Sequence, residues 1–219
     1  MIAEKLLPFL VFHILFYCFV MTWVIVGLGN PDEEHVRTRH NAGRMAVEYF
    51  AKKNNLGEWK EDSKSKSFIV RGAIGKQLVV CVLPNTYMNK SGSAVAHFVK
   101  SVKAAEKLIV VYDELDMGFG NLKISFDRGS GGHRGVESIA RAVKTKKFSR
   151  VRIGISRMNG KGEVQKPLGE TDVEKYILGN FSSAEFADLK GLFKKTTDGI
   201  EAIVREGYER AMNSFNSNR

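Results

Sequence analysis

Cysteine is scarce in this sequence, with only Cys18 and Cys81 among 219 residues. Two cysteines do not form a disulfide framework, and these two lack the paired spacing of a metal site. Cys81 lies in an apolar run, where we expect its thiol to be buried. The scarcity of cysteine therefore argues against a disulfide-stapled secreted scaffold and fits a protein of the reducing cytoplasm.

Three motifs of common enzyme classes are absent as well. The chain has no Gly-x-Ser-x-Gly sequence, so it lacks a serine nucleophile of that type. Gly27-Leu28-Gly29 begins like a dinucleotide-binding loop, but the third glycine is missing and acidic residues 32–34 would repel a pyrophosphate. The glycine-rich residues 128–135 are not followed by the Gly-Lys-Ser/Thr of a P-loop. A dinucleotide-dependent enzyme is therefore a disfavoured alternative.

Positive charge, by contrast, is abundant. The chain has 34 Lys and Arg against 24 Asp and Glu, which gives a net charge of +10. Hydrophobic residues make up 43% and charged residues 26%, a composition typical of a globular chain. This net charge favours a polyanionic partner, either nucleic acid or an anionic membrane surface. A soluble protein that is basic for other reasons remains the alternative.

Residues 1–20 differ from the rest of the chain, because residues 6–20 are apolar except for His13. As a helix this run would span about 22 Å, which is short of the roughly 30 Å hydrocarbon core of a bilayer. Three interpretations are open: a true translation start at Met21, a weak membrane anchor, or a signal peptide without a small-residue cleavage site. We favour the start at Met21, and so expect no membrane association and one domain at residues 21–219.

Strand-like and helix-like segments alternate along that domain. We expect strands at residues 23–27, 67–71, 77–83, 108–112, 121–126 and 151–156. We expect helices at residues 42–54 (capped by Asn41), 93–102, 136–144, 172–178 and 183–212, and polar loops at 60–66 and 158–170. This alternation, without a repeat or a long linker, predicts a single three-layer α/β domain. Its central sheet is expected to be mixed, mostly parallel, and flanked by helices.

Polar residues follow three of these strands, namely Asn30, residues 85–89 and Asp113. Ligands of such sheets bind beyond the carboxyl ends of the strands, so we expect these residues along one edge. If Asp113 accepts a hydrogen bond from His40, it fixes the imidazole tautomer and leaves the other ring nitrogen free as a base. Because no nucleophile motif accompanies the pair, it indicates activation of water.

Three further residues near this edge offer groups for a substrate. Asn30 and Asn89 carry neutral amides, which donate hydrogen bonds to a developing oxyanion or hold a water molecule. Met88 offers a soft apolar wall. Taken alone, either asparagine is better explained by turn formation, and the methionine is explained by core packing, so these assignments depend on the pair formed by His40 and Asp113.

Basic residues gather farther along the chain. Residues 128–135 lead into a helix, and the backbone N–H groups of a helix N-terminus bind anions, here with help from Arg128, His133 and Arg134. More positive charge follows within nine residues, at Lys144, Lys146, Lys147, Arg150 and Arg152. A strip of this kind favours a track for phosphates.

Together these motifs resemble the bacterial-type peptidyl-tRNA hydrolase family. The matching stretches, in the order and approximate spacing of the family, are VGLGNP, TRHNAG, PNTYMNKSG, DELD, GSGGHRG, VRIGI and YILGNF. Each is weak alone, but together they are specific, and they cover about residues 22–213. The resemblance implies a cytoplasmic enzyme that cuts the ester between a stalled nascent peptide and tRNA. It also implies a monomer that needs neither a metal nor an organic cofactor.

The resemblance implies roles for single residues. His40 matches the catalytic base, and Asp113 matches the carboxylate that orients it. The positions that match contacts to substrate or tRNA are Asn30, His35, Met88, Asn89, Arg134 and Arg152. Of these, the two asparagines match amides that organise the water, the methionine lines the peptide site, and Arg152 belongs to a clamp for the tRNA 5′-phosphate.

The chain departs from the family pattern at several positions. Arg134 stands where many members have an asparagine, so we assign it to substrate or phosphate contact. Ser125 stands where some members have the lysine of the phosphate clamp, and His35 replaces a common tyrosine. The alternative function is that of a noncatalytic RNA-binding protein, similar to the plant organelle splicing factors that resemble this family. The intact His40 and Asp113 disfavour it.

Overall fold

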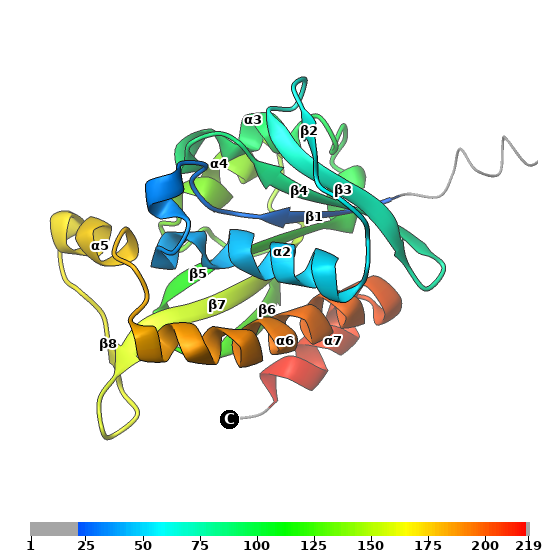
Figure 1. Cartoon of the computed structure of the whole chain (residues 1–219). Helices are drawn as coiled ribbons and strands as arrows, with labels where there is room; N and C mark the ends of the chain where they lie inside the picture. Colours follow the sequence, from blue (N-terminus) through cyan, green and yellow to red (C-terminus); the bar gives the residue numbers. More distant parts are fainter. Residues whose placement is uncertain (1–21, 218–219) are drawn as a thin grey trace, which may run out of the picture.

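The structure, a computed structural model, describes residues 22–217 of the chain (Figure 1). The extension at residues 1–20, with its three interpretations, lies outside this part. No helix within residues 22–217 combines the length and the apolar character that crossing a membrane requires.

Eight strands form one sheet, which is mixed as predicted but not mostly parallel, because four of its seven strand pairings are antiparallel. They are β1 (Trp23–Gly27), β2 (Lys60–Asp62), β3 (Ser67–Ile74), β4 (Gln77–Pro84), β5 (Leu108–Gly118), β6 (Leu122–Phe126), β7 (Ser149–Met158) and β8 (Val164–Gln165). The strand order is β2-β3-β4-β1-β5-β7-β6, and β8 pairs with β7. The four central strands, β4, β1, β5 and β7, are parallel to one another. The outer strands are antiparallel, so the parallel part is the centre of the sheet.

Helices cover both faces of this sheet and form three layers (Figure 1). They are α2 (Ala42–Lys53), α3 (Ser91–Val95), α4 (Arg134–Val143), α5 (Glu170–Ile177), α6 (Ser183–Glu206) and α7 (Tyr208–Asn216). The core on one face joins residues of β1 and β5 to α2, α6 and α7. The core on the other face joins the same strands to α3 and α4. Burial on both faces explains why the central strands are apolar without alternation.

Helix α5 lies at the margin of one core, against which its partly buried Tyr176 and Ile177 pack. It has no buried residue. It stands beyond the ends of β1 and β5, on the left in Figure 1, whereas the chain enters β1 from the opposite side. The carboxyl edge of the central strands is therefore the place where α5, the turn before α2 and the turn after β4 come together.

Four of the expected segments are wrong in part, and one of them is the loop at 158–170, which contains the short strand β8. Residues 60–66 are not all loop, because Lys60–Asp62 form the edge strand β2, whose charged side chains remain in water. The helix expected at 93–102 ends at Val95, and a separate 3-10 turn begins where the Ser101 hydroxyl accepts from the amide of Ala104. The helix expected at 183–212 breaks at Gly207, whose φ of +89° favours glycine.

Candidate active site

Two glycines bring α2 against the sheet at the end of β1. A Cβ at Gly43, in the first turn of α2, would lie 2.2 Å from the carbonyl oxygen of Val111 in β5. A Cβ at Gly27 would lie 2.8 Å from the carbonyl oxygen of Gly43. Because no side chain fits at either contact, the backbones approach closely. The 3-10 turn Arg39–Asn41, which precedes α2, is thereby placed over the edge of β5.

The Asn41 side chain fastens the loop after β1 instead of capping α2. It forms no capping hydrogen bond, so the predicted cap is wrong. Its Oδ1 accepts from the amide of Asn30 at 2.8 Å, and its Nδ2 donates to the carbonyl of Asn30 at 2.9 Å. The Asn30 side-chain oxygen in turn accepts from the amide of Met88 at 3.1 Å. These bonds leave the Nδ2 group of Asn30 as the part of its amide that can face a ligand.

His40 and Asp113 meet at this edge, as predicted, although 73 residues separate them. Nδ1 of His40 lies 3.0 Å and 3.1 Å from the two carboxylate oxygens. Both residues are buried, with 7% and 4% of their surface exposed. Asp113 was expected to follow its strand but lies within it, because β5 goes on pairing with β7 as far as Gly118, with a register shift after Glu114.

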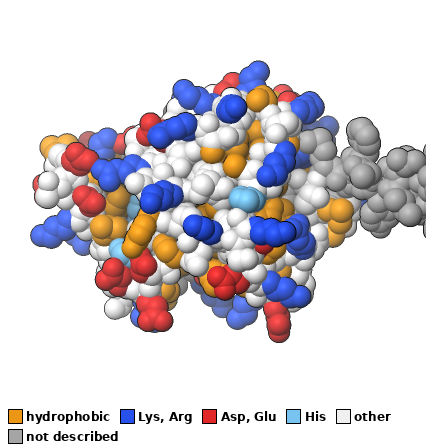
Figure 2. Space-filling model, turned by 90° about the horizontal axis from the view of Figure 1, so that it is seen from above, with side chains coloured by type: hydrophobic (Ala, Val, Ile, Leu, Met, Phe, Trp, Pro, Cys, Tyr) orange, Lys and Arg blue, Asp and Glu red, His pale blue; other side chains and the backbone are white. Residues whose placement is uncertain are grey.

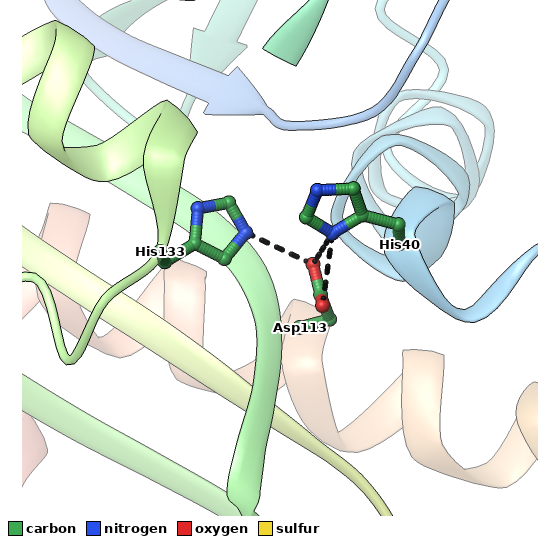
Figure 3. Close-up of side chains that lie close together, drawn as sticks. All are labelled: His40, Asp113 and His133. Carbon is green, nitrogen blue, oxygen red and sulfur yellow. Dashed lines mark hydrogen bonds and ion pairs between the residues drawn. The ribbon is translucent and has the colours of Figure 1, made fainter. Parts of the chain in front are cut away.

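A third residue, His133, joins this pair. Its Nε2 lies 3.0 Å from Oδ1 of Asp113, so the carboxylate sits between two imidazoles (Figure 3). Its Nδ1 accepts from the backbone amides of Gly135 and Val136 at 3.2 Å and 3.3 Å. The predicted anion site at the start of α4 is therefore wrong in this respect, because the His133 side chain already occupies two of its N–H groups.

These hydrogen bonds fix which ring nitrogens of His40 and His133 carry the protons that face Asp113. A backbone N–H only donates, so Nδ1 of His133 carries a lone pair and its Nε2 carries the proton that Asp113 accepts. Burial alone would raise the pKa of Asp113, but the two imidazoles outweigh burial and hold that pKa below its usual range. The ionised carboxylate accepts from Nδ1 of His40. When the His40 ring is neutral, its Nε2, which points away from Asp113 in Figure 3, is a free base.

A cleft of about 590 Å³ opens above this trio. Seven of the eight predicted site residues line it, namely Asn30, His35, His40, Met88, Asn89, Asp113 and Arg134. Met88 is buried in the floor, whereas Asn89 and Tyr87 are exposed at the rim. The eighth residue, Arg152, does not line the cleft, but its Nε donates to Glu114, which does, at 2.9 Å.

The basic residues are more dispersed than the sequence suggested. Lys144, Lys146 and Lys147 are exposed, and Figure 2 shows Lys and Arg side chains spread over the face above the sheet, with acidic side chains among them. Arg150 is fully buried, and its Nη1 donates to the carbonyl oxygen of Gly129 at 2.6 Å. Arg150 therefore cannot take part in the predicted surface strip. Arg134 spans the cleft mouth and pairs with Glu170 at 2.5 Å.

Sequence reasoning missed two parts of this site. Nothing in the sequence indicated the hydrogen bond between His133 and Asp113. Three basic or imidazole side chains in a glycine-rich stretch favour an anion-binding site instead. The cleft-lining face of α5 did have a signal. Five residues that line the cleft follow a spacing of three and four, which is typical of one helix face. They are Glu170, Val173, Glu174, Ile177 and Leu178.

Two clusters in residues 22–217 have atoms close enough to share a metal ion. His40, Asp113 and His133 place one ligand atom each within 4.8 Å of one another, and Asp32, Glu34 and His35 do the same at the rim. Imidazole and carboxylate are ligands that zinc accepts. In the first cluster the nitrogens that face Asp113 are already hydrogen-bonded, and an ion would have to replace those protons. The expected absence of a metal stays a prediction.

Comparisons with known proteins agree on one family. The family model described as peptidyl-tRNA hydrolase matches residues 24–219. The chain is 41% identical to the peptidyl-tRNA hydrolase of Mycobacterium ulcerans over 193 residues, which are 87% of this chain and 95% of that protein. It is 40% identical to the one of Chloroflexus aggregans, over 89% of this chain and 98% of that protein.

Solved structures give the same result. A crystal structure of peptidyl-tRNA hydrolase from Acinetobacter baumannii superposes with a TM-score of 0.78 at 33% sequence identity, covering 90% of this chain and 96% of that one. A peptidyl-tRNA hydrolase in complex with N-propanol superposes with a TM-score of 0.79 at 34% identity, over 90% of this chain and 96% of that one. The sequence matches and the fold agree, and this chain belongs to the peptidyl-tRNA hydrolase family.

Proposed function

We propose that this protein hydrolyses the ester bond between a nascent peptide and tRNA in peptidyl-tRNA. Membership of the family supports the reaction and the substrate. One observation carries the assignment to this site: a neutral imidazole, held by a buried carboxylate, presents its free nitrogen in a cleft lined by two asparagine amides. Such an arrangement activates water without forming a covalent intermediate.

In this mechanism His40 is the general base. Its Nε2 takes a proton from water, and the oxygen of that water attacks the carbonyl carbon of the ester. The charge that develops on the carbonyl oxygen is stabilised by the N–H donors at Nδ2 of Asn30 and Asn89, neutral amides that do not compete with His40 for the proton of the water. Collapse of the tetrahedral species breaks the ester C–O bond. The departing ribose oxygen takes the proton back from His40, releasing the peptide acid and tRNA.

Asp113 and His133 serve this base without touching the substrate. Asp113 holds His40 in the tautomer with a free Nε2 and stabilises the imidazolium that forms. His133 donates to the same carboxylate oxygen and fixes its position. We propose that the active form is a monomer, as the resemblance to the family implies. It works in the cytoplasm, where tRNA leaves the ribosome, and needs no metal.

The function is tested with purified protein that starts at Met21 and a peptidyl-tRNA with one labelled N-blocked amino acid. We expect release of the blocked amino acid and of intact tRNA, and no conversion in protein-free controls. A protein that binds this substrate but never cleaves it would instead support the noncatalytic RNA-binding alternative, which the comparisons do not favour.

His133 offers a test of the positioning role. The change His133→Ala is expected to lower kcat by about tenfold while KM stays within about twofold, because Asp113 loses one of the bonds that aim it at His40. His133→Asn restores a donor at a similar place and should recover part of kcat. Steady-state kinetics of the two variants checks this. Equal loss in both, with matching losses in thermal stability, would mean that His133 is merely structural.

Arg152 offers a test of phosphate binding. Its Nε is bonded to Glu114, which leaves its Nη groups for a phosphate. We expect Arg152→Gln to raise KM for peptidyl-tRNA with little change in kcat, and to reduce the slope of log KM against log salt concentration by about one. Measurement of KM between low and moderate salt checks both effects. Lys161→Gln, an exposed change in the β7–β8 turn, is the matched control.

A further inference from the structure

Helix α5 presents one face to the cleft, and that face is part apolar and part acidic. Val173, Ile177 and Leu178 are half-buried there, and Glu170 and Glu174 are exposed beside them. The outer face of α5 carries Thr171, Asp172 and Lys175, which do not line the cleft. The helix is tied below by the Tyr176 hydroxyl, which donates to the carbonyl of Ile155 at 2.8 Å, and by Arg39, which stacks on the Tyr176 ring.

The cleft is acidic although the chain is basic. Five carboxylates line it, namely Asp113, Glu114, Asp116, Glu170 and Glu174, against the two cations Arg134 and Lys166. Four of the five have basic or imidazole partners: Asp113 has two histidines, Glu114 has Arg152, Asp116 has Lys166, and Glu170 has Arg134. Within residues 22–217, Glu174 has no such partner within 4.0 Å, so its charge is the one left uncompensated in the cleft.

This distribution of charge indicates different binding places for the tRNA and for the peptide of the substrate. A phosphodiester is repelled by the uncompensated Glu174 carboxylate of α5, whereas Arg152 and Lys123, adjacent on β7 and β6, lie outside the cleft and suit the tRNA backbone. The α5 face suits a peptide, whose apolar side chains bury Val173, Ile177 and Leu178. We infer that Glu174 sets a charge preference in the peptidyl part of the substrate, so that peptides with a cationic residue near the ester are cleaved faster than acidic ones.

This inference rests on the proposed function and adds the class of peptide that the enzyme prefers. Glu174 attracts a lysine or arginine side chain of the peptide and repels an aspartate or glutamate. Because the group is exposed, water and salt weaken both effects. Between otherwise identical cationic and acidic substrates we expect a difference in kcat/KM of about threefold to tenfold, the size that two exposed charge interactions give together.

The experiment compares two substrates that differ in one side chain. N-acetyl-Lys-Phe-tRNA and N-acetyl-Glu-Phe-tRNA share the tRNA, the ester and the last residue, so tRNA binding and ester reactivity cancel in the ratio of kcat/KM. The unaltered protein should prefer the lysine substrate by about threefold to tenfold. Glu174→Gln keeps the size of the side chain and should bring the ratio close to one, mainly by slowing the lysine substrate and speeding the glutamate substrate.

Asp172→Asn is the matched control, because it removes one negative charge from the same helix on the face that does not line the cleft. Its ratio should equal that of the unaltered protein. A ratio of one in the unaltered protein, or the same ratio in Glu174→Gln, would overturn the inference while the cleavage of both substrates upholds the function. An equal shift of the ratio in Asp172→Asn would also overturn it, because the preference would then come from the net charge of the helix and not from Glu174 in the cleft. Failure to cleave either substrate would reject the proposed function and remove the inference with it.

Discussion

The change His40→Ala is expected to lower kcat for peptidyl-tRNA by about 10²- to 10⁴-fold, the contribution typical of a positioned general base. The reason is local. Of the four ring nitrogens of His40 and His133, Nε2 of His40 is the one without a hydrogen bond to the protein. The other three are already hydrogen-bonded, so no neighbouring imidazole can accept the proton of the attacking water in its place. Binding of tRNA should persist, because the general base contributes to the chemical step, whereas Arg152, the residue proposed to bind phosphate, does not line the cleft.

Single-turnover cleavage and a tRNA-binding titration, made on the same preparation, separate these two effects. His97→Ala is the control, since His97 is exposed on the turn after α3 and does not line the cleft. That variant should cleave at the rate of the unaltered protein. Near-normal turnover by His40→Ala would reject the assignment of His40 as the base, and a parallel loss of tRNA binding would show that the ring acts in binding.

The meeting of His40 and Asp113 was predictable, because it depends on strand order and not on side-chain packing. β1 and β5 are parallel neighbours, so the loop that leaves β1 and the far end of β5 must share one edge of the sheet. The residues between them do not alter this. The position of Asp113 inside its strand was not predictable. The sequence pattern places the end of the strand where the apolar run ends, but β5 continues through polar residues.

Two other features depend on packing that no local pattern contains. His133 turns away from solvent because Asp113 and the two amides of α4 satisfy both of its ring nitrogens at once. Arg150 lies in a strand of alternating pattern, where a charged residue is expected to be exposed. It is buried instead, and the carbonyl oxygen of Gly129 accepts a hydrogen bond from its guanidinium group. For both residues the hydrogen-bond partner depends on the tertiary fold. The charge or titratable character of the side chain, taken alone, wrongly predicts that the residue is exposed.

Arg134 shows how a departure from the family pattern becomes interpretable in the structure. Its exposed guanidinium reaches Glu170 across the cleft mouth, so its charge is shared between α4 and α5. Contact with the substrate, as predicted from the sequence, then requires that Glu170 give way. Because both side chains are more than half exposed, this exchange costs little, as ion pairs in water contribute about 0–1 kcal/mol.

The change Asp113→Asn is expected to lower kcat by about 10²-fold, less than the loss in His40→Ala, because the base is still present but poorly held. An asparagine has one acceptor oxygen, whereas the carboxylate contacts Nδ1 of His40 with both of its oxygens. If the amide nitrogen faces His40, the ring must shift its proton to Nε2, and the free base is lost. If the oxygen faces His40, the neutral amide still stabilises the imidazolium less than a carboxylate does.

Measurement of kcat, KM and thermal stability for Asp113→Asn and Asp113→Ala distinguishes orientation from folding. The alanine variant leaves two buried imidazole N–H groups without an acceptor, which costs about 1–3 kcal/mol for each group. It should therefore melt at a lower temperature than the asparagine variant, while KM stays near that of the unaltered protein in both. Full kcat in a folded Asp113→Asn protein would show that His40 needs no carboxylate, and the base would then have to be oriented by the substrate itself.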